Sequence, residues 1–410
     1  MPENKPNEYW IEQLKEKREK INQISPSFCS AKWLQTTLYL QNGYNHSCHH
    51  PSPHKIPVKE VLENPAALHN SNYKKQQRIK MINGERPKEC DYCWRIEDQG
   101  KGHFSDRHYK TADWWSWDKV DVIATDNPTK DVYPTYLEVS FSNACNFACA
   151  YCSPEISSEW MKDIEKNGDY PVEFGSGNLD YLRQVEKFPY KHSDPNPYVD
   201  AFWKWFPEAL PHLRVFRITG GEPTMSKDVW KVLDYIYENA QPELSIAINS
   251  NLGTTPKLIQ RLVDSCNKLR DKVKQIEIYT SAEAIGEQAE YIRDGMDYDY
   301  WRSNVEKVLT ETDANVAIMT TLNILSMTTF ENFIEDIMQL RIKYNKDLAN
   351  NRIPLSINYL RFPPHLQCTL LDRNTRISYA SDYELTAKVW LKYNSPDKFA
   401  RIYLEEYDQI

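Results

Sequence analysis

Residues 136–152 read YLEVSFSNACNFACAYC, an apolar run followed at once by three closely spaced cysteines. The run Tyr136–Phe141 is short and rich in apolar and aromatic residues, which predicts a buried strand. Cys145, Cys149 and Cys152 then lie in the loop at its carboxyl end. In α/β barrels the chemistry takes place in loops at this end of the strands. We therefore expect a functional loop at the carboxyl end of a parallel sheet.

Similar short apolar runs recur along the chain and predict five further strands, at Arg214–Thr219, Leu244–Asn249, Gln275–Thr280, Asn315–Leu322 and Pro354–Leu360. Amphipathic segments lie between them. In Pro256–Leu269 the apolar residues recur at helical spacing, and Val229–Tyr237, Tyr300–Leu309 and Phe330–Tyr344 behave similarly. Six β–α repeats imply a parallel sheet with right-handed crossovers. We expect an α/β fold that closes into a partial (β/α)6 barrel, with a doubly wound open sheet as the alternative.

The amino-acid composition of the sequence changes near residue 130. Residues 1–130 are rich in His, Trp, Pro and Asn, and we expect them to form a small cysteine-rich α+β accessory domain. Residues 131–370 carry the β–α repeats. Within them, 153–212 is too long for a simple connection and predicts a first helix plus an insertion over the barrel mouth. Residues 371–410 are expected to form a C-terminal helical extension.

Bulk composition narrows the function classes. The chain has 40% hydrophobic residues, enough for a packed core, and a formal net charge of −8. A negative net charge disfavours nucleic acid as a partner, because phosphate binding needs clustered Lys and Arg. No run approaches the roughly 18 apolar residues of a membrane span, and the N-terminus lacks the apolar core of a signal peptide. We expect a cytoplasmic protein with no membrane partner.

Nine cysteines in a reducing compartment favour metal binding over disulfides, and seven of them fall into two groups with ligand-like spacing. In the first group, Cys145, Cys149 and Cys152 can hold three irons of a 4Fe–4S cluster and leave the fourth iron open. An open iron can bind the amino and carboxylate groups of S-adenosylmethionine (SAM) and pass an electron to its sulfonium. The alternatives are zinc with a fourth ligand, or three packed thiols.

The C-x3-C-x2-C spacing, with Tyr151 before the last cysteine, resembles the signature of the radical SAM superfamily. Gly220, Gly221 and Glu222 end the second predicted strand and resemble the Gly-Gly-Glu motif of that superfamily. The resemblance implies that the glycines let the backbone approach a ligand closely. It also implies that the Glu222 carboxylate accepts hydrogen bonds from the SAM ammonium. By itself, the Gly-Gly-Glu segment would indicate an ordinary turn.

Further SAM contacts are implied by the same resemblance. Asn249 and Asn251 end the third predicted strand, and Ser281 ends the fourth. They lie where the ribose and carboxylate of SAM are bound in the superfamily. Arg293 resembles a residue that pairs with the SAM carboxylate. For all four, the alternative is a turn or a helix cap, which Asn and Ser favour in any protein.

The second cysteine group is Cys29, Cys48, Cys90 and Cys93. A strand-forming segment and a turn glycine predict a hairpin near the first two, and the stretch Val58–Asn83 predicts a helix before the Cys-x-x-Cys loop. Four thiols make a closed tetrahedral site, which suits zinc or a 4Fe–4S cluster. The pattern resembles SPASM/twitch accessory domains, which hold an auxiliary 4Fe–4S cluster but usually follow the barrel. The histidines around the hairpin, His46, His49, His50 and His54, are expected to be solvent-exposed loop residues, with a substitute ligand as the alternative.

The resemblance implies a radical SAM enzyme that cleaves SAM reductively and forms a 5′-deoxyadenosyl radical. That radical would abstract a hydrogen atom from a peptide or small-molecule substrate. The partner it implies is an electron donor such as flavodoxin or ferredoxin. Two alternatives stay open at this point: an activating enzyme of the glycyl-radical type, and a zinc-binding module without catalysis.

Overall fold

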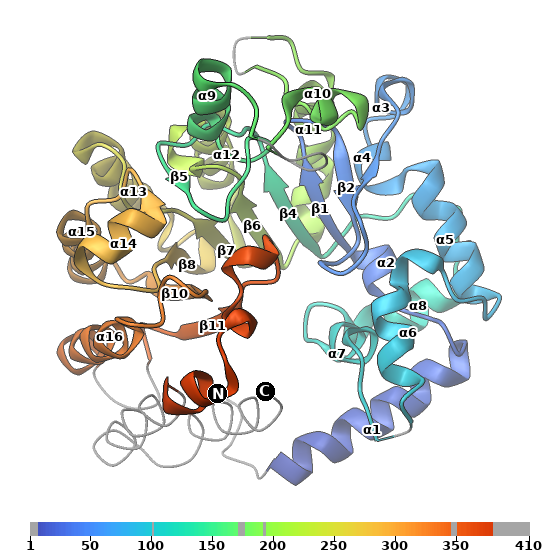
Figure 1. Ribbon diagram of the computed structural model, residues 1–410. Helices are drawn as coiled ribbons and strands as arrows, with labels where there is room; N and C mark the ends of the chain where they lie inside the picture. Colours follow the sequence, from blue (N-terminus) through green and yellow to red (C-terminus); the bar gives the residue numbers. More distant parts are fainter. Residues whose placement is uncertain (1–6, 101, 171–176, 192–193, 346–350, 380–410) are drawn as a thin grey trace. The chain divides into compact units, whose positions relative to one another are not determined.

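The predicted strands are present in the computed structural model, which describes residues 7–100, 102–170, 177–191, 194–345 and 351–379 (Figure 1). They are β4 (Tyr136–Ser140), β6 (Val215–Thr219), β7 (Gln241–Asn249), β8 (Val273–Ser281), β10 (Asn315–Leu322) and β11 (Leu355–Tyr359). The fold is α/β with a large, mostly parallel sheet, as the sequence indicated. Closure of that sheet into a partial barrel stays a prediction.

The chain divides into two compact units. The first comprises Met1–Ser142, Arg183–Gly220 and Glu243–Ser245, and the second comprises Asn143–Leu182, Gly221–Pro242 and Ile246–Ile410. Cys145, Cys149 and Cys152, which we call the triad, belong to the second unit. The four N-terminal cysteines belong to the first unit. Each unit therefore carries one complete cysteine group. The domain boundaries expected from the sequence stay predictions.

Strands of the first unit run in the order β6-β4-β1-β2-β3. β1 (Gln35–Tyr39) pairs in parallel with β4, and β2 (Tyr44–His46) and β3 (His54–Lys55) follow as antiparallel neighbours. The turn between β1 and β2 contains Gly43 at φ +73°, where a Cβ would lie 2.0 Å from the ring of Tyr198. The hairpin expected near Cys48 is thus present, and the cysteine-rich segment contributes a strand beside β4. A separate accessory domain over residues 1–130 stays a prediction.

Short helices surround this hairpin, and the helical stretch expected over Val58–Asn83 is divided into three helices. The stretch contains α3 (Val58–Glu63), α4 (Ala67–Asn70) and α5 (Asn72–Ile82). Asn64 precedes a proline, which disfavours helical backbone, and it is extended. Ser71 is also extended and caps α5 by accepting a hydrogen bond from the Lys74 N–H at 3.3 Å. Other helices of this unit are α1 (Asn7–Ile24), α2 (Ala31–Leu34), α6 (Asp91–Glu97), α7 (Asp106–Ala112), α8 (Val120–Thr125) and α11 (Pro197–Ala209).

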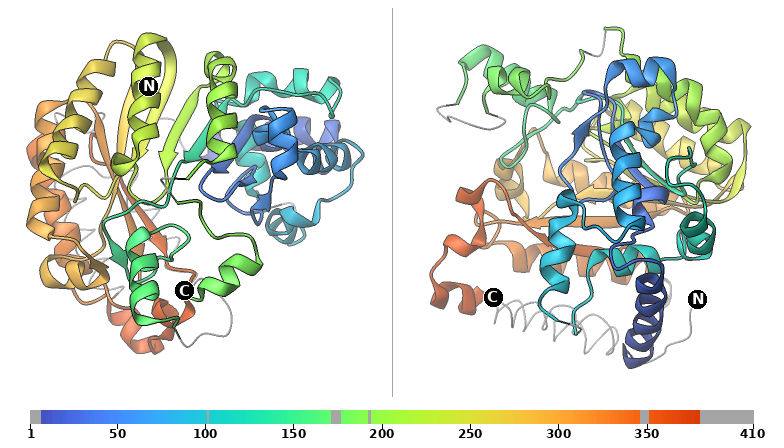
Figure 2. Two further views of the ribbon diagram at one scale, coloured as in Figure 1. Left: turned by 90° about the horizontal axis from the view of Figure 1, so that it is seen from above. Right: turned by 90° about the vertical axis from the view of Figure 1, so that its right-hand side faces the viewer.

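Strands of the second unit follow the order β11-β10-β8-β7, and β10 pairs in parallel with both β8 and β11. The connecting helices are α12 (Lys227–Glu238), α13 (Pro256–Leu269), α15 (Tyr298–Glu311) and α16 (Phe330–Tyr344). They form one layer beside these strands, drawn from yellow to orange in Figure 2. The apolar residues of these helices are buried, as their helical spacing predicted. This strand-and-helix layer supports the loops that carry the chemistry.

Two smaller features complete the second unit. A two-stranded ribbon pairs β5 (Ala148–Cys149) with β9 (Arg293–Asp294), just after α14 (Gly286–Ile292). The expected helix and insertion over residues 153–212 contain α9 (Ser158–Asn167), α10 (Leu179–Gln184) and then α11 of the first unit. Of the expected C-terminal extension, residues 373–379 are helical and 380–410 lie outside the described residues. Among the residues with described structure, no helix is both long and apolar enough to span a membrane.

Candidate functional site

The triad loop is fixed by the start of α9. The backbone N–H of Cys145 donates to Ser158 Oγ at 3.0 Å, and the Ser158 hydroxyl donates to the Cys145 carbonyl at 3.0 Å. The hydroxyl of Ser157, the N-cap of α9, donates to the Phe147 carbonyl at 2.6 Å. Phe147 itself is buried. The loop therefore has a defined path even though its residues form almost no regular structure.

The three triad thiols lie close enough to influence one another. Burial, with smaller contributions from the neighbouring cysteines, raises the pKa of Cys145 and Cys152 to about 12. Burial also raises the pKa of the Cys149 thiol, and the charge of Arg293 opposes that rise. Thiolates are the metal-binding form of cysteine, so a bound cation would have to deprotonate these thiols. Three soft sulfur donors on one loop are the ligand set of an iron–sulfur cluster.

As their side chains are placed, no group of three or more His, Cys, Asp or Glu within the described residues could hold a metal ion. All three triad cysteines are free thiols. The donor set of the loop, three cysteine sulfurs, fits a 4Fe–4S cluster that keeps one iron open.

The Gly-Gly-Glu segment is attached directly to the triad loop. A Cβ on Gly221 would lie 2.3 Å from the Ala144 carbonyl oxygen and 2.8 Å from that of Asn143, so only glycine fits. The backbone N–H of Glu222 donates to the same Ala144 carbonyl at 2.6 Å. Gly220, the other predicted glycine, has φ +128°, which also favours glycine. The close approach expected of these glycines is made to the cysteine loop.

The Glu222 carboxylate is 1% exposed and held by hydrogen bonds from the chain. Its Oε1 accepts from the Thr224 N–H at 3.0 Å, the Thr224 hydroxyl at 2.7 Å and the Ser250 hydroxyl at 2.9 Å. Its Oε2 accepts from the Asn251 N–H at 2.6 Å. Burial raises the pKa of Glu222, and these hydrogen bonds oppose that rise. Among the described residues, Oε1 accepts three hydrogen bonds and Oε2 accepts one, so Oε2 can accept another.

Sequence reasoning missed Ser250 and Thr224, although Ser250 lies between the two predicted asparagines. The side chain of Asn251 donates to Asn146 Oδ1 at 2.9 Å and accepts from the Gly253 N–H at 2.9 Å. It therefore ties the end of β7 to the triad loop. Asn249 and Ser281 lie half-buried at the carboxyl ends of β7 and β8. The predicted residues thus gather at strand ends, and Asn251 is already engaged by the chain.

Arg293 and Tyr151 meet at a buried carboxylate that the sequence did not single out, Glu283. The Arg293 guanidinium donates to Glu283 Oε2 from Nη2 at 2.7 Å and from Nε at 3.2 Å. The Tyr151 hydroxyl donates to Glu283 Oε1 at 3.0 Å, and Arg293 Nη2 also contacts that hydroxyl. Arg293 Nη1 lies 3.8 Å from Cys149 Sγ. Arg293 is therefore placed at a triad sulfur, whereas the resemblance implied a contact with the SAM carboxylate.

A cavity of about 640 Å³ adjoins the triad loop. Ala148 and Ala150 line it, together with Trp160, Tyr170, Asp294 and His365. Side chains alternate between the two faces of a strand, so the ribbon presents Ala148 and Asp294 to this cavity and Cys149 and Arg293 to the opposite face. The indole of Trp160 donates to the Cys149 carbonyl at 2.8 Å. The cavity is thus separated from the Cys149 thiol by a single strand.

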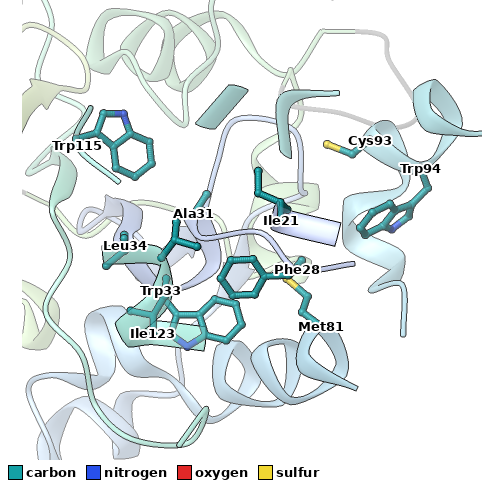
Figure 3. Packing of buried hydrophobic residues seen from close by; sticks show 11 residues of the cluster. Ile21, Phe28, Ala31, Trp33, Leu34, Met81, Cys93, Trp94, Trp115 and Ile123 are labelled. Carbon is teal, nitrogen blue, oxygen red and sulfur yellow. The ribbon is translucent and has the colours of Figure 1, made fainter. Parts of the chain in front are cut away.

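The second cysteine group is also brought together. Cys29 precedes α2, Cys48 follows β2, Cys90 ends a short 3-10 turn and Cys93 lies in α6, yet all four line one small cavity. Burial raises the pKa of Cys48 to about 11 and those of Cys90 and Cys93 to about 12. Cys93 belongs to the hydrophobic core of the first unit, with Trp94, Phe28 and Met81 (Figure 3).

Buried ion pairs surround this second cavity. Lys32 pairs with Glu89, and the two side chains are 3% and 9% exposed. Arg107 lines the cavity and pairs with Glu97 at 2.8 Å. Among the four hairpin histidines, His50 lines the cavity, where it contacts Asp106 and stacks on Tyr92 at a centroid distance of 3.6 Å. Cations close to four thiols favour a negatively charged metal–thiolate group at this place.

Comparisons with known proteins point to one superfamily. Residues 139–337 match the model of the radical SAM superfamily. GTP 3′,8-cyclase of Sulfurimonas denitrificans is 28% identical over 130 residues, which is 32% of this chain and 31% of that protein. GTP 3′,8-cyclase of Pectobacterium atrosepticum is 31% identical over 104 residues, covering 25% of this chain and 23% of that protein. The matches thus span less than a third of these relatives.

A solved structure, Streptococcus suis SuiB, aligns with 87% of this chain and 69% of its own, at 13% identity and a TM-score of 0.36. A score this low does not define the fold, which rests on the strand order given above.

Proposed function

Residues 139–337 match the model of the radical SAM superfamily, and from this premise we propose that the chain is an enzyme of that type and that Cys145, Cys149 and Cys152 hold a 4Fe–4S cluster with one open iron. When bound and reduced, the cluster supplies an electron to the sulfonium of SAM, which splits a C–S bond and releases a 5′-deoxyadenosyl radical. The observation that carries the proposal is the attachment of the Gly-Gly-Glu segment to the triad loop. Glu222 is buried there, and its backbone N–H donates a hydrogen bond to the Ala144 carbonyl at 2.6 Å.

Glu222 is the residue we assign to the SAM ammonium. Its remaining acceptor position on Oε2 can take one N–H of an ammonium, and a charge-assisted bond of this kind is stronger than a neutral one. Thr224, Ser250 and Asn251 hold the carboxylate in place, so little reorganisation is needed when the ligand arrives. Asn249 and Ser281, at the neighbouring strand ends, are our candidates for the ribose and carboxylate.

The radical would abstract a hydrogen atom from a peptide or a small molecule. The substrate of the GTP 3′,8-cyclases is not proposed for this chain, because the matched stretch covers less than a third of those proteins. The electron would come from a partner such as flavodoxin or ferredoxin. A partial (β/α)6 barrel is the form that we propose for the sheet.

We propose an auxiliary 4Fe–4S cluster on Cys29, Cys48, Cys90 and Cys93, with zinc as the alternative. The support is a single cavity lined by four thiols, with the buried Lys32 and Arg107 nearby. A site with four thiolates leaves no iron open, so its role would be to position substrate or accept an electron.

The test is anaerobic reconstitution with iron and sulfide, followed by incubation with SAM and dithionite. We expect a brown, oxygen-sensitive protein that releases 5′-deoxyadenosine and methionine. Reconstituted protein with SAM bound and no 5′-deoxyadenosine after reduction would contradict the proposal. Iron, sulfide and zinc are counted in the same sample, and about eight irons are expected if both sites hold 4Fe–4S clusters.

A further inference from the structure

We propose that Arg293 is a positioning residue that donates a hydrogen bond to the Cys149 sulfur and thereby raises the reduction potential of the cluster held by the triad. Glu283 and Tyr151 fix the guanidinium in that place. The role rests on the proposed function, because without a cluster on Cys149 there is no potential to set.

The backbone places Arg293 beside Cys149. In the antiparallel ribbon, Cys149 of β5 is directly opposite Arg293 of β9, and the Ala150 N–H donates to the Ile292 carbonyl at 2.7 Å. Directly opposite residues have their side chains on the same face, with Cβ atoms about 4.5–5.5 Å apart. The neighbouring Gly295 is required here, since a Cβ on it would lie 2.6 Å from the Asn146 carbonyl oxygen. The contact therefore follows from strand register and does not depend on a freely moving side chain.

The guanidinium has a partner at each of its three nitrogens. Nε and Nη2 donate to Glu283, Nη2 also contacts the Tyr151 hydroxyl, and Nη1 is 3.8 Å from Cys149 Sγ. Arg293 is 6% exposed and Glu283 is 1% exposed, so water competes little for these bonds. Arginine presents its donors in a rigid fork, which lets one residue bind a carboxylate and a sulfur at the same time.

The sign of the effect follows from electrostatics. Reduction adds one negative charge to the cluster, and a nearby positive charge with an N–H aimed at a sulfur ligand stabilises the reduced form. Hydrogen bonds to the sulfurs and local net charge are established determinants of cluster potential. Glu283 carries the opposite charge and partly offsets the guanidinium. Removing Arg293 should therefore lower the potential, and neutralising Glu283 should raise it.

This role differs from the pairing with the SAM carboxylate that the sequence resemblance implied. To bind that carboxylate, the guanidinium would have to leave the buried pair with Glu283, and breaking such a pair is costly. The two roles make different predictions. A ligand of SAM changes SAM affinity, whereas a donor to the sulfur changes the potential in the absence of SAM.

The experiment is an anaerobic redox titration, followed by electron paramagnetic resonance, of the reconstituted parent and of Arg293→Gln, Glu283→Gln and Arg302→Gln. Arg302 is the matched control, because its guanidinium pairs with Asp336 at 2.7 Å and with Glu306 in the same unit. The triad signal is recognised in each protein as the one that changes when SAM is added. We expect a more negative midpoint for Arg293→Gln, a more positive one for Glu283→Gln, and the parent value for Arg302→Gln.

Unchanged midpoints in the Arg293 and Glu283 variants, or shifts of the same sign in both, would overturn the role. A purely structural contribution would not give opposite signs. If Arg293→Gln fails to take up the cluster, Arg293→Lys replaces it and should also give a midpoint below that of the parent, because the fork is lost; a Lys midpoint at the parent value contradicts the role. Failure of the proposed function looks different, since the parent itself would then show no signal that responds to SAM.

Discussion

The two cysteine groups of this chain are assembled in opposite ways. The triad lies within residues 145–152, on one loop whose path is fixed by Ser157 and Ser158. The other four cysteines come from segments spread over residues 29–93 and meet only because the first unit folds around them. A local site can be recognised by spacing alone, whereas an assembled site depends on the tertiary structure of its unit. We therefore expect the two sites to differ in how strongly folding depends on them.

Their surroundings differ as well. Two groups lie close to the triad loop: a buried acceptor, Glu222, and one cation, Arg293, that contacts a sulfur. Four thiols line the other cavity, together with Arg107 and Lys110, and buried ion pairs lie beside it. The first arrangement suits a cluster that must bind a ligand, and the second suits a closed group that the ligand does not reach.

The largest effect is expected from the triad itself. Replacing Cys145, Cys149 and Cys152 with Ala should remove about four irons and abolish 5′-deoxyadenosine formation, because no cluster then contacts SAM. The measurement is iron analysis together with chromatography of the reaction products. Replacing Cys266 with Ala is the control, since this buried thiol lies on the apolar face of α13. Full iron content in the triple variant would remove the triad from the cluster site.

Replacing cysteines of the second group should affect that group and leave the triad intact. Replacing Cys90 and Cys93 with Ala should remove the metal of the first unit and lower its thermal stability, because ligands from distant segments are no longer tied together. Reductive cleavage of SAM should persist, while turnover of the true substrate falls. Metal analysis and thermal unfolding check this. Loss of one zinc and no iron would replace the auxiliary cluster with a structural zinc site.

Lys32→Met should lower the stability of the first unit and leave the cleavage of SAM unchanged. It leaves the Glu89 carboxylate buried without its cation, and breaking a buried pair of this kind costs about 3–5 kcal/mol. We expect that loss in the free energy of unfolding, with cleavage of SAM unchanged. Glu89→Gln in the same background should recover part of the loss, because the unpaired charge is removed. Parental stability in Lys32→Met would show that the pair does not hold the first unit together.

The smallest effect is expected from Glu222, the hydrogen-bond acceptor that we assign to the SAM ammonium. Glu222→Gln keeps the shape of the side chain but removes its charge, and a hydrogen bond to a charged group is worth about 1.5–3 kcal/mol. SAM affinity should therefore fall about 10- to 100-fold while the cluster remains. Calorimetry under anaerobic conditions measures the affinity, with the exposed Glu238→Gln as control. Parental affinity would remove Glu222 from the SAM site.

Features that depend on close neighbours in the sequence could be predicted. The six strands, the helix Pro256–Leu269 and the Gly-Gly-Glu turn each show their pattern within a few residues. The helical stretch over Val58–Asn83 is present, but its division into three helices, at a pre-proline residue and at a capping serine, was not predicted.

Features that depend on pairing between distant segments could not be predicted. Nothing in Gln35–Tyr39 shows that this strand pairs with Tyr136–Ser140 about a hundred residues later. The contact of Arg293 with Cys149 depends on the register of two strands of two residues each, too short for any alternation to be seen. Glu283 was passed over for the same reason, because its role appears only when Arg293 and Tyr151 are placed around it.

The most direct test of the two-site account is electron–nuclear double resonance on the reduced protein with SAM that carries 15N at its amino group. Coupling of that nitrogen to the cluster reports an open iron with SAM bound to it. We predict the coupling in the parent protein and in the Cys90→Ala/Cys93→Ala variant, and its absence from the triple variant of Cys145, Cys149 and Cys152. Coupling that survives loss of the triad, or that disappears with Cys90 and Cys93, would contradict the assignment of SAM chemistry to the second unit.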